Sequence, residues 1–278
     1  MSAAMDRIEK ALAKARGNTS GPANGDIEAT IDNGARKDGR ATAPLDAVSA
    51  DRERLIALNF GHPAADLFRI LRAQVFRALR SADKSTLGIC SARPGEGKTF
   101  TAANLAASMA LSHEQPVLLV DLDLKRPSAH GYFHTEPSPG VTDFLSGTMS
   151  IVDCIRPTDI KGLELLASGK PILNSSEALG SAEIIKRFNE IRRRNPRQLI
   201  IYDLPPMLVS DDVLAFSSEI DAIIFIIEEG RTKLGEMQRA LDLIPRDKLI
   251  GTILNKSRGN NPFPYSPYYS PDGDHARV

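Results

Sequence analysis

Ser91-Ala92-Arg93-Pro94-Gly95-Glu96-Gly97-Lys98-Thr99 fixes the architecture expected of this chain. A short apolar run at 85–90 precedes it, and a helix-forming run at 98–112 follows it. A glycine-rich turn between a strand and a helix lets backbone N–H groups close around phosphate, and the helix adds the positive end of its dipole. The sequence therefore predicts a phosphate-binding loop whose contacts run into the helix: Pro94, Gly95, Glu96, Gly97, Lys98, Thr99 and Phe100.

Two side chains of this loop carry the expected chemistry. Lys98 can reach the β- and γ-phosphates of a nucleoside triphosphate, and the Thr99 hydroxyl can ligate Mg²⁺. The usual G-x-x-x-x-G-K-[ST] pattern has glycine at the position of Ala92. Alanine keeps the turn if its φ is negative, so we expect this substitution to be tolerated.

Acidic residues end two further apolar runs. Asp121 and Asp123 follow one run, and Asp203 ends another. Ligand chemistry in α/β proteins gathers at the carboxyl ends of parallel strands. An aspartate at such a position can also simply cap the next turn, which is the favoured interpretation for each acid alone. Beside a phosphate loop, the three acids together predict a Mg²⁺ site that includes Thr99.

Apolar runs of strand length alternate with runs of helix length from residue 85 onward. This rhythm predicts an α/β fold of the P-loop NTPase class, with a mostly parallel central sheet flanked by helices on both faces. The expected strands are 85–90, 116–121, 163–167, 198–203, 222–228 and 249–254. The expected helices are 63–80, 98–112, 139–146, 181–194, 209–217 and 233–244.

Composition and the order of segments predict the cellular setting and the domain organisation of the 278 residues. The formal net charge is zero, which gives no global field to attract nucleic acid. Two cysteines and no signal peptide predict a cytoplasmic protein. No apolar run approaches the roughly 20 residues that cross a bilayer. We expect a short helix at 1–16, a disordered linker at 17–50, a P-loop domain at 51–258 and a flexible tail at 259–278.

The tail concentrates aromatic residues. Tyr265, Tyr268 and Tyr269 lie there among prolines and polar residues that build neither a helix nor a central strand. A tyrosine hydroxyl, with a pKa near 10, is a poor nucleophile at neutral pH without assistance. Taken by itself, the tail is more simply a disordered segment in which the aromatics are incidental.

The chain resembles the bacterial tyrosine kinases of capsule and exopolysaccharide export, which are MinD-related P-loop proteins. The resemblance runs from about residue 63 to the end of the chain. It is carried by the loop at 91–99, by Asp121-Leu122-Asp123-Leu124-Lys125-Arg126-Pro127 and by Ile201-Tyr202-Asp203-Leu204-Pro205-Pro206. The runs at 140–147 and 174–179 also look like that family.

This resemblance implies roles for particular residues. It implies that ATP with Mg²⁺ is bound, that Asn255 holds the adenine, and that Tyr265, Tyr268 and Tyr269 are autophosphorylated by a neighbouring subunit. The catalytic set it implies is Lys98, Asp121, Asp123 and Asp203, with Asp121 a candidate acceptor of the tyrosine proton.

The resemblance also implies partners. The oligomer-interface motif of the family is Glu-x-x-Arg-x-x-Arg, and here it reads Asp66-x-x-Arg69-x-x-Arg72, with a shorter acid. The family relationship implies a ring-forming homo-oligomer and a transmembrane polysaccharide co-polymerase that activates it. The protein would then act peripherally at the inner membrane through that partner.

Two alternatives remain open from the sequence. One is a positioning ATPase of the MinD/ParA type, which usually carries an extra lysine early in the loop. Ala92, Arg93 and Pro94 supply none. The basic run at 186–197 is more simply a solvated helix face than a surface that touches DNA nonspecifically, and no specific nucleic acid is expected as a partner. The other is a non-catalytic scaffold that binds ATP. The histidines and cysteines show no zinc-ligand spacing.

Overall fold

The computed structural model describes residues 54–258. The helix expected at 1–16, the linker expected at 17–50 and the tail at 259–278 lie outside the described residues, as do Tyr265, Tyr268 and Tyr269. No helix within 54–258 combines the length and the apolar character that crossing a bilayer requires.

All the predicted strands are present, and the structure adds β3. The strands are β1 (Thr86–Ser91), β2 (Val117–Asp121), β3 (Ile155–Pro157), β4 (Leu163–Leu166), β5 (Leu199–Asp203), β6 (Ala222–Glu228) and β7 (Leu249–Asn255). The longer helices are α3 (Pro63–Arg80), α4 (Lys98–Leu111), α9 (Ala182–Arg194) and α11 (Leu234–Asp242). The short helices are η1 (Ile56–Leu58), α5 (Ala129–Tyr132), α6 (Val141–Leu145), α7 (Ile151–Cys154), α8 (Ser175–Leu179), α10 (Asp212–Phe216) and η2 (Ser217–Glu219).

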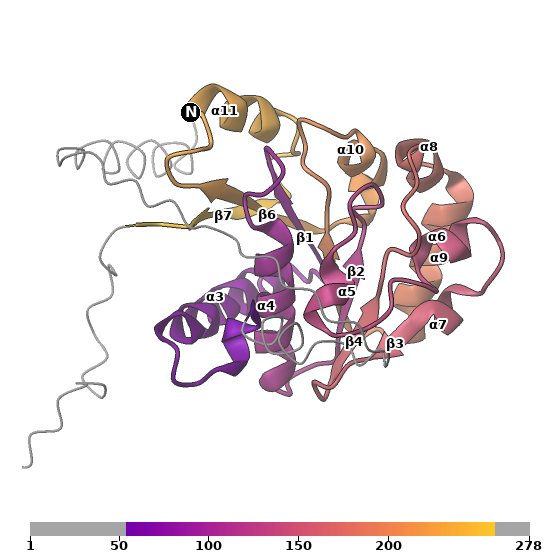
Figure 1. The fold of residues 1–278 in the computed structure, drawn as a ribbon, viewed down its shortest axis with the longest axis horizontal. Coiled ribbons are helices and arrows are strands. Elements are labelled where there is room, and N and C mark those ends of the chain that lie inside the picture. The colour runs from indigo at the N-terminus through magenta and orange to yellow at the C-terminus, as the bar shows by residue number, and fades with distance from the viewer. Residues whose placement is uncertain (1–53, 259–278) are drawn as a thin grey trace, which may run out of the picture. The chain divides into compact units, whose positions relative to one another are not determined.

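The strands of the described region form one seven-stranded sheet in the order β3-β4-β2-β5-β1-β6-β7 (Figure 1). Neighbouring strands run parallel except for β3, which is antiparallel to β4. The mostly parallel α/β sheet predicted from the sequence is therefore confirmed. Some of the shortest elements, such as β3 and α8, were not predicted, because they are too short to show a periodicity.

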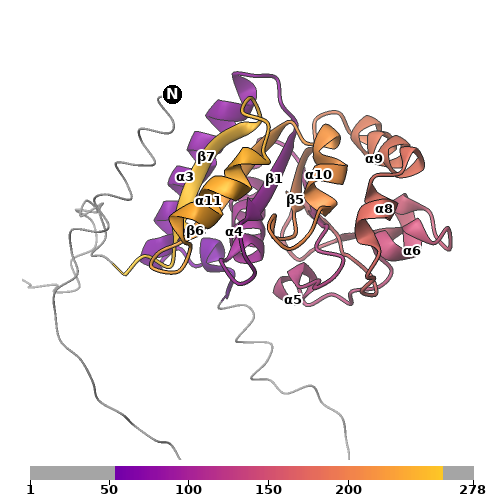
Figure 2. The ribbon, with the colours of Figure 1, turned by 90° about the horizontal axis from the view of Figure 1, so that it is seen from above.

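Helices cover both faces of the sheet (Figure 2). Helix α4 packs against β1, β2 and β5 on one face, beneath α3. Its small residues, such as Ala103 and Ala107, are fully buried and allow this close approach. On the other face, Tyr202 of β5 packs edge-to-face with Phe188 of α9 and Phe216 of α10, at centroid distances of 6.0 and 5.1 Å. The small residues of α4 on one face and the aromatic cluster on the other fix the position of β2 and β5, the strands that carry the acids.

The pairing register brings the strand ends together. Asp121 of β2 lies opposite Asp203 of β5, and Asp203 lies beside Ile89 of β1. The phosphate loop begins directly after β1. Three chain segments that are far apart in sequence therefore meet at one carboxyl edge of the sheet.

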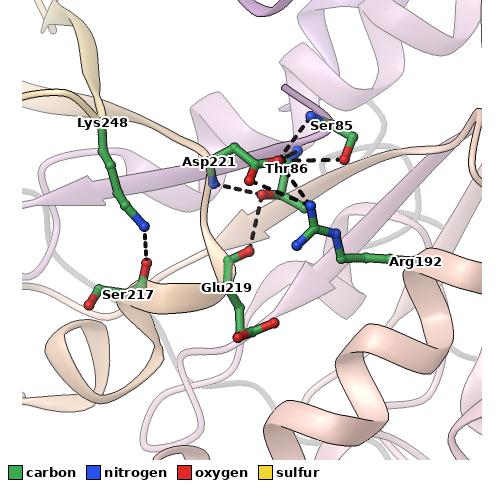
Figure 3. A network of polar contacts seen from close by, with 7 residues as sticks. All are labelled: Ser85, Thr86, Arg192, Ser217, Glu219, Asp221 and Lys248. Atoms are coloured by element: carbon green, nitrogen blue, oxygen red, sulfur yellow. Dashed lines mark hydrogen bonds and ion pairs between the residues drawn. The ribbon is translucent and has the colours of Figure 1, made fainter. Parts of the chain in front are cut away.

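The opposite edge of the sheet is tied by Asp221, which precedes β6 (Figure 3). Its carboxylate accepts hydrogen bonds from the backbone N–H groups of Ser85 and Thr86, at 3.0 and 2.9 Å. Arg192 of α9 lies 3.3 Å from the same oxygen. Burial would raise the pKa of Asp221, but these donors outweigh it and hold that pKa below its usual range.

Asp221→Ala is expected to lower the free energy of unfolding by about 2–4 kcal/mol at pH 7, because it leaves two partly buried backbone donors without acceptors. The folded-state pKa is depressed, so the stabilisation is present above the unfolded pKa and is lost as the pH falls through the folded one. Urea unfolding at pH 7 and at pH 3 measures this. Asp247→Ala, at an exposed position, is the control, and equal losses in the two variants would contradict the assignment.

Candidate functional site

The phosphate loop depends on two left-handed glycines. Gly95 has φ 83° and Gly97 has φ 96°. A Cβ on Gly97 would lie 2.0 Å from Nδ2 of Asn255, which donates a hydrogen bond to the Glu96 carbonyl at 2.9 Å. Ala92 is not among the described residues with positive φ, so alanine fits there as expected. The loop therefore packs closely against Asn255 at the end of β7, and only glycine fits at position 97.

A cavity of about 620 Å³ lies over this loop. Eight predicted site residues line it: Pro94, Gly95, Gly97, Lys98, Thr99, Phe100, Asp123 and Asn255. Five others were not predicted as site residues: Arg54, Arg126, Ser128, Tyr132 and Lys256. Arg126 belongs to the run that begins at Asp121, and Lys256 follows Asn255. Their closeness in sequence to predicted site residues is a signal that could have identified them. Arg54 and Tyr132 reach the cavity only through the tertiary fold and carry no local signal.

The Glu96 side chain points into the protein. Its side chain is fully buried and does not line the cavity. The carboxylate accepts a hydrogen bond from the Arg93 N–H at 2.8 Å and another from the Thr232 hydroxyl. Because both oxygens bind within the protein, this side chain shapes the loop. Contact of Glu96 with phosphate through its backbone N–H stays a prediction.

Lys98 and Asp123 form a buried ion pair. The Nζ atom of Lys98 lies 2.7 Å from Oδ2 of Asp123, and the two side chains are 9% and 7% exposed. Burial would lower the pKa of Lys98, but the charges of Asp203 and Asp123 outweigh it and raise that pKa. Lys98 therefore stays cationic at the floor of the cavity.

Asp121 lies beneath this pair and holds the following turn. Its Oδ1 accepts from the Asp123 N–H at 3.1 Å, and its Oδ2 accepts from the N–H groups of Ser128 and Ala129 at 3.0 Å each. Burial raises the pKa of Asp121 to about 6, against the lowering effects of the Ala129 N–H and the Lys98 charge. Both oxygens are thus committed to the backbone.

Asp203 differs from the other two acids. It is fully buried, and neither carboxylate oxygen has a hydrogen-bond partner within residues 54–258. The Thr99 hydroxyl is near enough to lower the pKa of Asp203 without completing a hydrogen bond. Burial raises this pKa to about 7, the Lys98 charge opposes the shift, and Asp121 adds to it. A buried carboxylate without a hydrogen-bond partner is suited to a ligand from outside the chain, such as an ion.

The three acids predicted as metal ligands have different surroundings in this structure, and their roles as ligands stay a prediction. No group of three His, Cys, Asp or Glu side chains between residues 54 and 258 is arranged to hold one ion together. The physical reason is that Asp121 binds backbone donors and Asp123 binds Lys98. Mg²⁺ usually takes only one or two protein carboxylates and completes its shell with phosphates and water. The free oxygens of Asp203, beside the Thr99 hydroxyl, fit that smaller demand.

The predicted interface residues lie on α3, apart from the cavity lining. Asp66 and Arg69 pair with one another on the helix surface. Arg72 donates a hydrogen bond from Nη1 to the Ser108 carbonyl of α4 at 2.7 Å. Within one chain, Arg72 therefore fastens α3 to α4, and a role of these residues between subunits stays a prediction.

Comparison with known proteins agrees with this geometry. The family model of the CobQ/CobB/MinD/ParA nucleotide binding domain matches residues 87–265. Among solved structures, the kinase domain of the Escherichia coli tyrosine kinase ETK superposes with a TM-score of 0.66 at 27% identity, over 76% of this chain and 84% of that one. The BceF tyrosine kinase domain gives the same TM-score at 25% identity, over 76% and 88%.

Curated relatives point the same way. CpsD of Streptococcus agalactiae, a tyrosine-protein kinase, is 31% identical over 192 residues, which are 66% of this chain and 82% of that protein. The tyrosine-protein kinase YwqD of Bacillus subtilis is 29% identical over 75% of this chain and 87% of its own. The tyrosine-protein kinase ptk of Acinetobacter johnsonii is 31% identical over 69% of this chain, which spans about a quarter (26%) of that relative. The chain belongs to the CobQ/CobB/MinD/ParA family of nucleotide-binding domains and, within it, to the group of the bacterial tyrosine-protein kinases.

Proposed function

We propose that this chain is an ATP-dependent protein-tyrosine autokinase that transfers the γ-phosphate of ATP to Tyr265, Tyr268 and Tyr269 of a neighbouring subunit. The observation that carries the proposal is the position of β7. Its last residue, Asn255, and the next residue, Lys256, line the cavity over the phosphate loop. The segment that bears the three tyrosines therefore follows directly from the rim of this site.

The residues of the loop would bind and orient the nucleotide. Backbone N–H groups around Gly95 and Gly97 face the phosphates, and Lys98 exchanges its contact with Asp123 for phosphate oxygens. Thr99 and Asp203 would hold Mg²⁺, which neutralises phosphate charge when bound. Asn255, which lines the same cavity, would hold the adenine.

The transfer step needs little covalent help from the protein. The tyrosine oxygen bonds to the γ-phosphorus while the bond to the β–γ bridging oxygen breaks, and that electron pair leaves with ADP. The phenolic proton passes to a carboxylate. Asp123 faces the cavity, whereas Asp121 is held by the backbone, so geometry favours Asp123 beside the acceptor and Asp121 as its support. Positioning and charge stabilisation carry most of the rate in such a loose transition state.

The proposed setting is the inner membrane, where a transmembrane co-polymerase would activate the kinase and couple it to capsule or exopolysaccharide export. Ring assembly through Asp66, Arg69 and Arg72 would present each tail to the next subunit. Each phosphate adds about −1.5 to −2 charges to a tail. Repulsion between phosphorylated tails would then loosen the ring and give a cycle of assembly and release.

Phosphate transfer by the purified chain tests the proposal. With ATP, Mg²⁺ and the cytoplasmic segment of the activator, mass spectrometry is expected to find phosphate on the peptide that contains Tyr265, Tyr268 and Tyr269. A variant with all three replaced by phenylalanine is the control and should lose nearly all label. A tail that stays unmodified while ATP still raises Tm would support the scaffold alternative instead.

DNA binding tests the positioning-ATPase alternative. The α9 surface already argues against it, because several of its arginines are committed to acids of the same chain. Arg187 lies 3.3 Å from Glu190, and Arg192 lies 3.3 Å from Asp221. Salt-dependent anisotropy with duplex DNA is expected to show no more than weak, nonspecific binding.

A further inference from the structure

The cavity over the phosphate loop is lined by four cationic side chains: Arg54, Lys98, Arg126 and Lys256. Two of them are anchored by ion pairs. Lys98 lies 2.7 Å from Asp123. Lys256 donates to the Gly95 carbonyl at 2.7 Å and lies 3.1 Å from the Glu228 carboxylate. Both cations are therefore already paired with acids of the same chain, Lys98 at the floor of the cavity and Lys256 at its rim.

The two arginines differ from one another. Arg54 stacks over Tyr132, 4.5 Å from the ring centroid, and donates to its hydroxyl at 3.0 Å. The guanidinium of Arg126 has no hydrogen bond or ion pair to any residue from 54 to 258. Its backbone is nevertheless fixed, because the Arg126 N–H donates to the carbonyl and to Oδ1 of Asp123, at 3.1 Å each. The backbone of Arg126 is therefore fixed, while its guanidinium has no partner within the described part of the chain.

The neighbouring cation, Lys125, does have partners, so the lack of a partner is particular to Arg126. Lys125 donates from Nζ to the Ser210 hydroxyl at 2.8 Å and lies 3.7 Å from the buried carboxylate of Asp212. It does not line the cavity. Lys125 therefore bonds to the β5–α10 loop, whereas Arg126, the next residue, lines the cavity.

We propose that Arg126 binds the terminal phosphate of the nucleotide and stabilises its charge during transfer. The inference rests on the proposed phosphoryl transfer and deepens it. A guanidinium offers several donors in a planar fork that matches phosphate oxygens, and it is weakly hydrated. The backbone of Arg126 is bonded to Asp123, and Asp123 pairs with Lys98. Lys98 is the residue that we expect to reach the β- and γ-phosphates. Arg126 therefore stands on the terminal-phosphate side of the cavity.

Nucleotide affinities test this without reliance on kinase activity. Arg126→Ala is expected to weaken binding of Mg·ATP by about 10- to 100-fold, the effect of a charge-assisted contact, while ADP affinity changes less than about 2-fold. Calorimetric titration with ATP and with ADP measures the two. Arg126→Lys should recover part of the ATP affinity. Arg193→Ala, at another exposed arginine on α9, is the matched control and should change neither. Because Arg126 is exposed, Tm should stay within about 1 °C.

Each outcome decides the matter. Equal losses for ATP and ADP, or no loss for either, would overturn the assignment to the terminal phosphate. Unchanged ATP affinity with a loss of phosphate transfer that extra acceptor peptide restores would assign Arg126 to the acceptor instead. If the wild-type chain binds ATP but labels no tyrosine, the autokinase proposal fails, and the selective loss of ATP affinity still tests Arg126.

Discussion

Lys98→Met is expected to lower phosphate transfer to the tail tyrosines by about 10³-fold or more, because it removes the buried cation that meets the transferring phosphate. The change also acts on the acids around it. The Lys98 charge lowers the pKa of both Asp203 and Asp121. Without it, these buried carboxyls bind protons more readily, and the negative charge of the site falls at neutral pH. The loss of the cation and the protonation of the acids both lower the rate of phosphate transfer.

The measurement is incorporation of radiolabelled phosphate at saturating Mg·ATP, with Tm recorded on the same sample. Removing one partner of a buried ion pair costs roughly 3–5 kcal/mol, so the variant must be shown to be folded. Lys98→Met combined with Asp123→Asn removes the uncompensated charge and provides that folded comparison. If either variant labels Tyr265, Tyr268 and Tyr269 as fast as the wild type, the proposed role of Lys98 is wrong.

Asp203→Asn is expected to abolish Mg²⁺-dependent ATP binding and to stabilise the ligand-free protein at the same time. The carboxylate is fully buried without a hydrogen-bond partner among the described residues. Its folded-state pKa, about 7, lies well above the ordinary value of an aspartate, because the group is buried. A raised carboxyl pKa means that stability falls as the pH rises from the unfolded pKa to the folded one. Removing the charge should therefore add about 1–3 kcal/mol at pH 8, or roughly 2–10 °C in Tm, and little at pH 4.

Thermal unfolding at pH 4 and pH 8, with and without Mg·ATP, measures both halves of this prediction. The wild-type protein should gain Tm on addition of Mg·ATP at pH 8, and the variant should not. Asp211→Asn, a substitution at an exposed position near α10, controls for loss of one negative charge. A variant that is less stable at pH 8 and still gains Tm from Mg·ATP would show that Asp203 has a structural partner and no ligand role.

Local pattern predicted most of the fold. The run from Ser85 through the loop to α4, and the apolar runs that end at Asp121 and Asp203, were read correctly as strand, loop, helix and strand ends. These features are local, because a buried parallel strand needs a continuous apolar run and a phosphate loop needs glycines at φ above zero. The registers that bring these strand ends together follow from the α/β topology.

The sequence by itself determined which residues stand at the carboxyl edge, and only the tertiary structure decided what each of them does there. Glu96 turns inward because Thr232, from a distant loop, meets its carboxylate. Lys125 turns toward Ser210, so that of these two neighbouring cations only Arg126 lines the cavity. Spacing along the chain sets where a backbone position falls, but the direction of a side chain depends on partners from other segments, and those partners meet only once the sheet has formed.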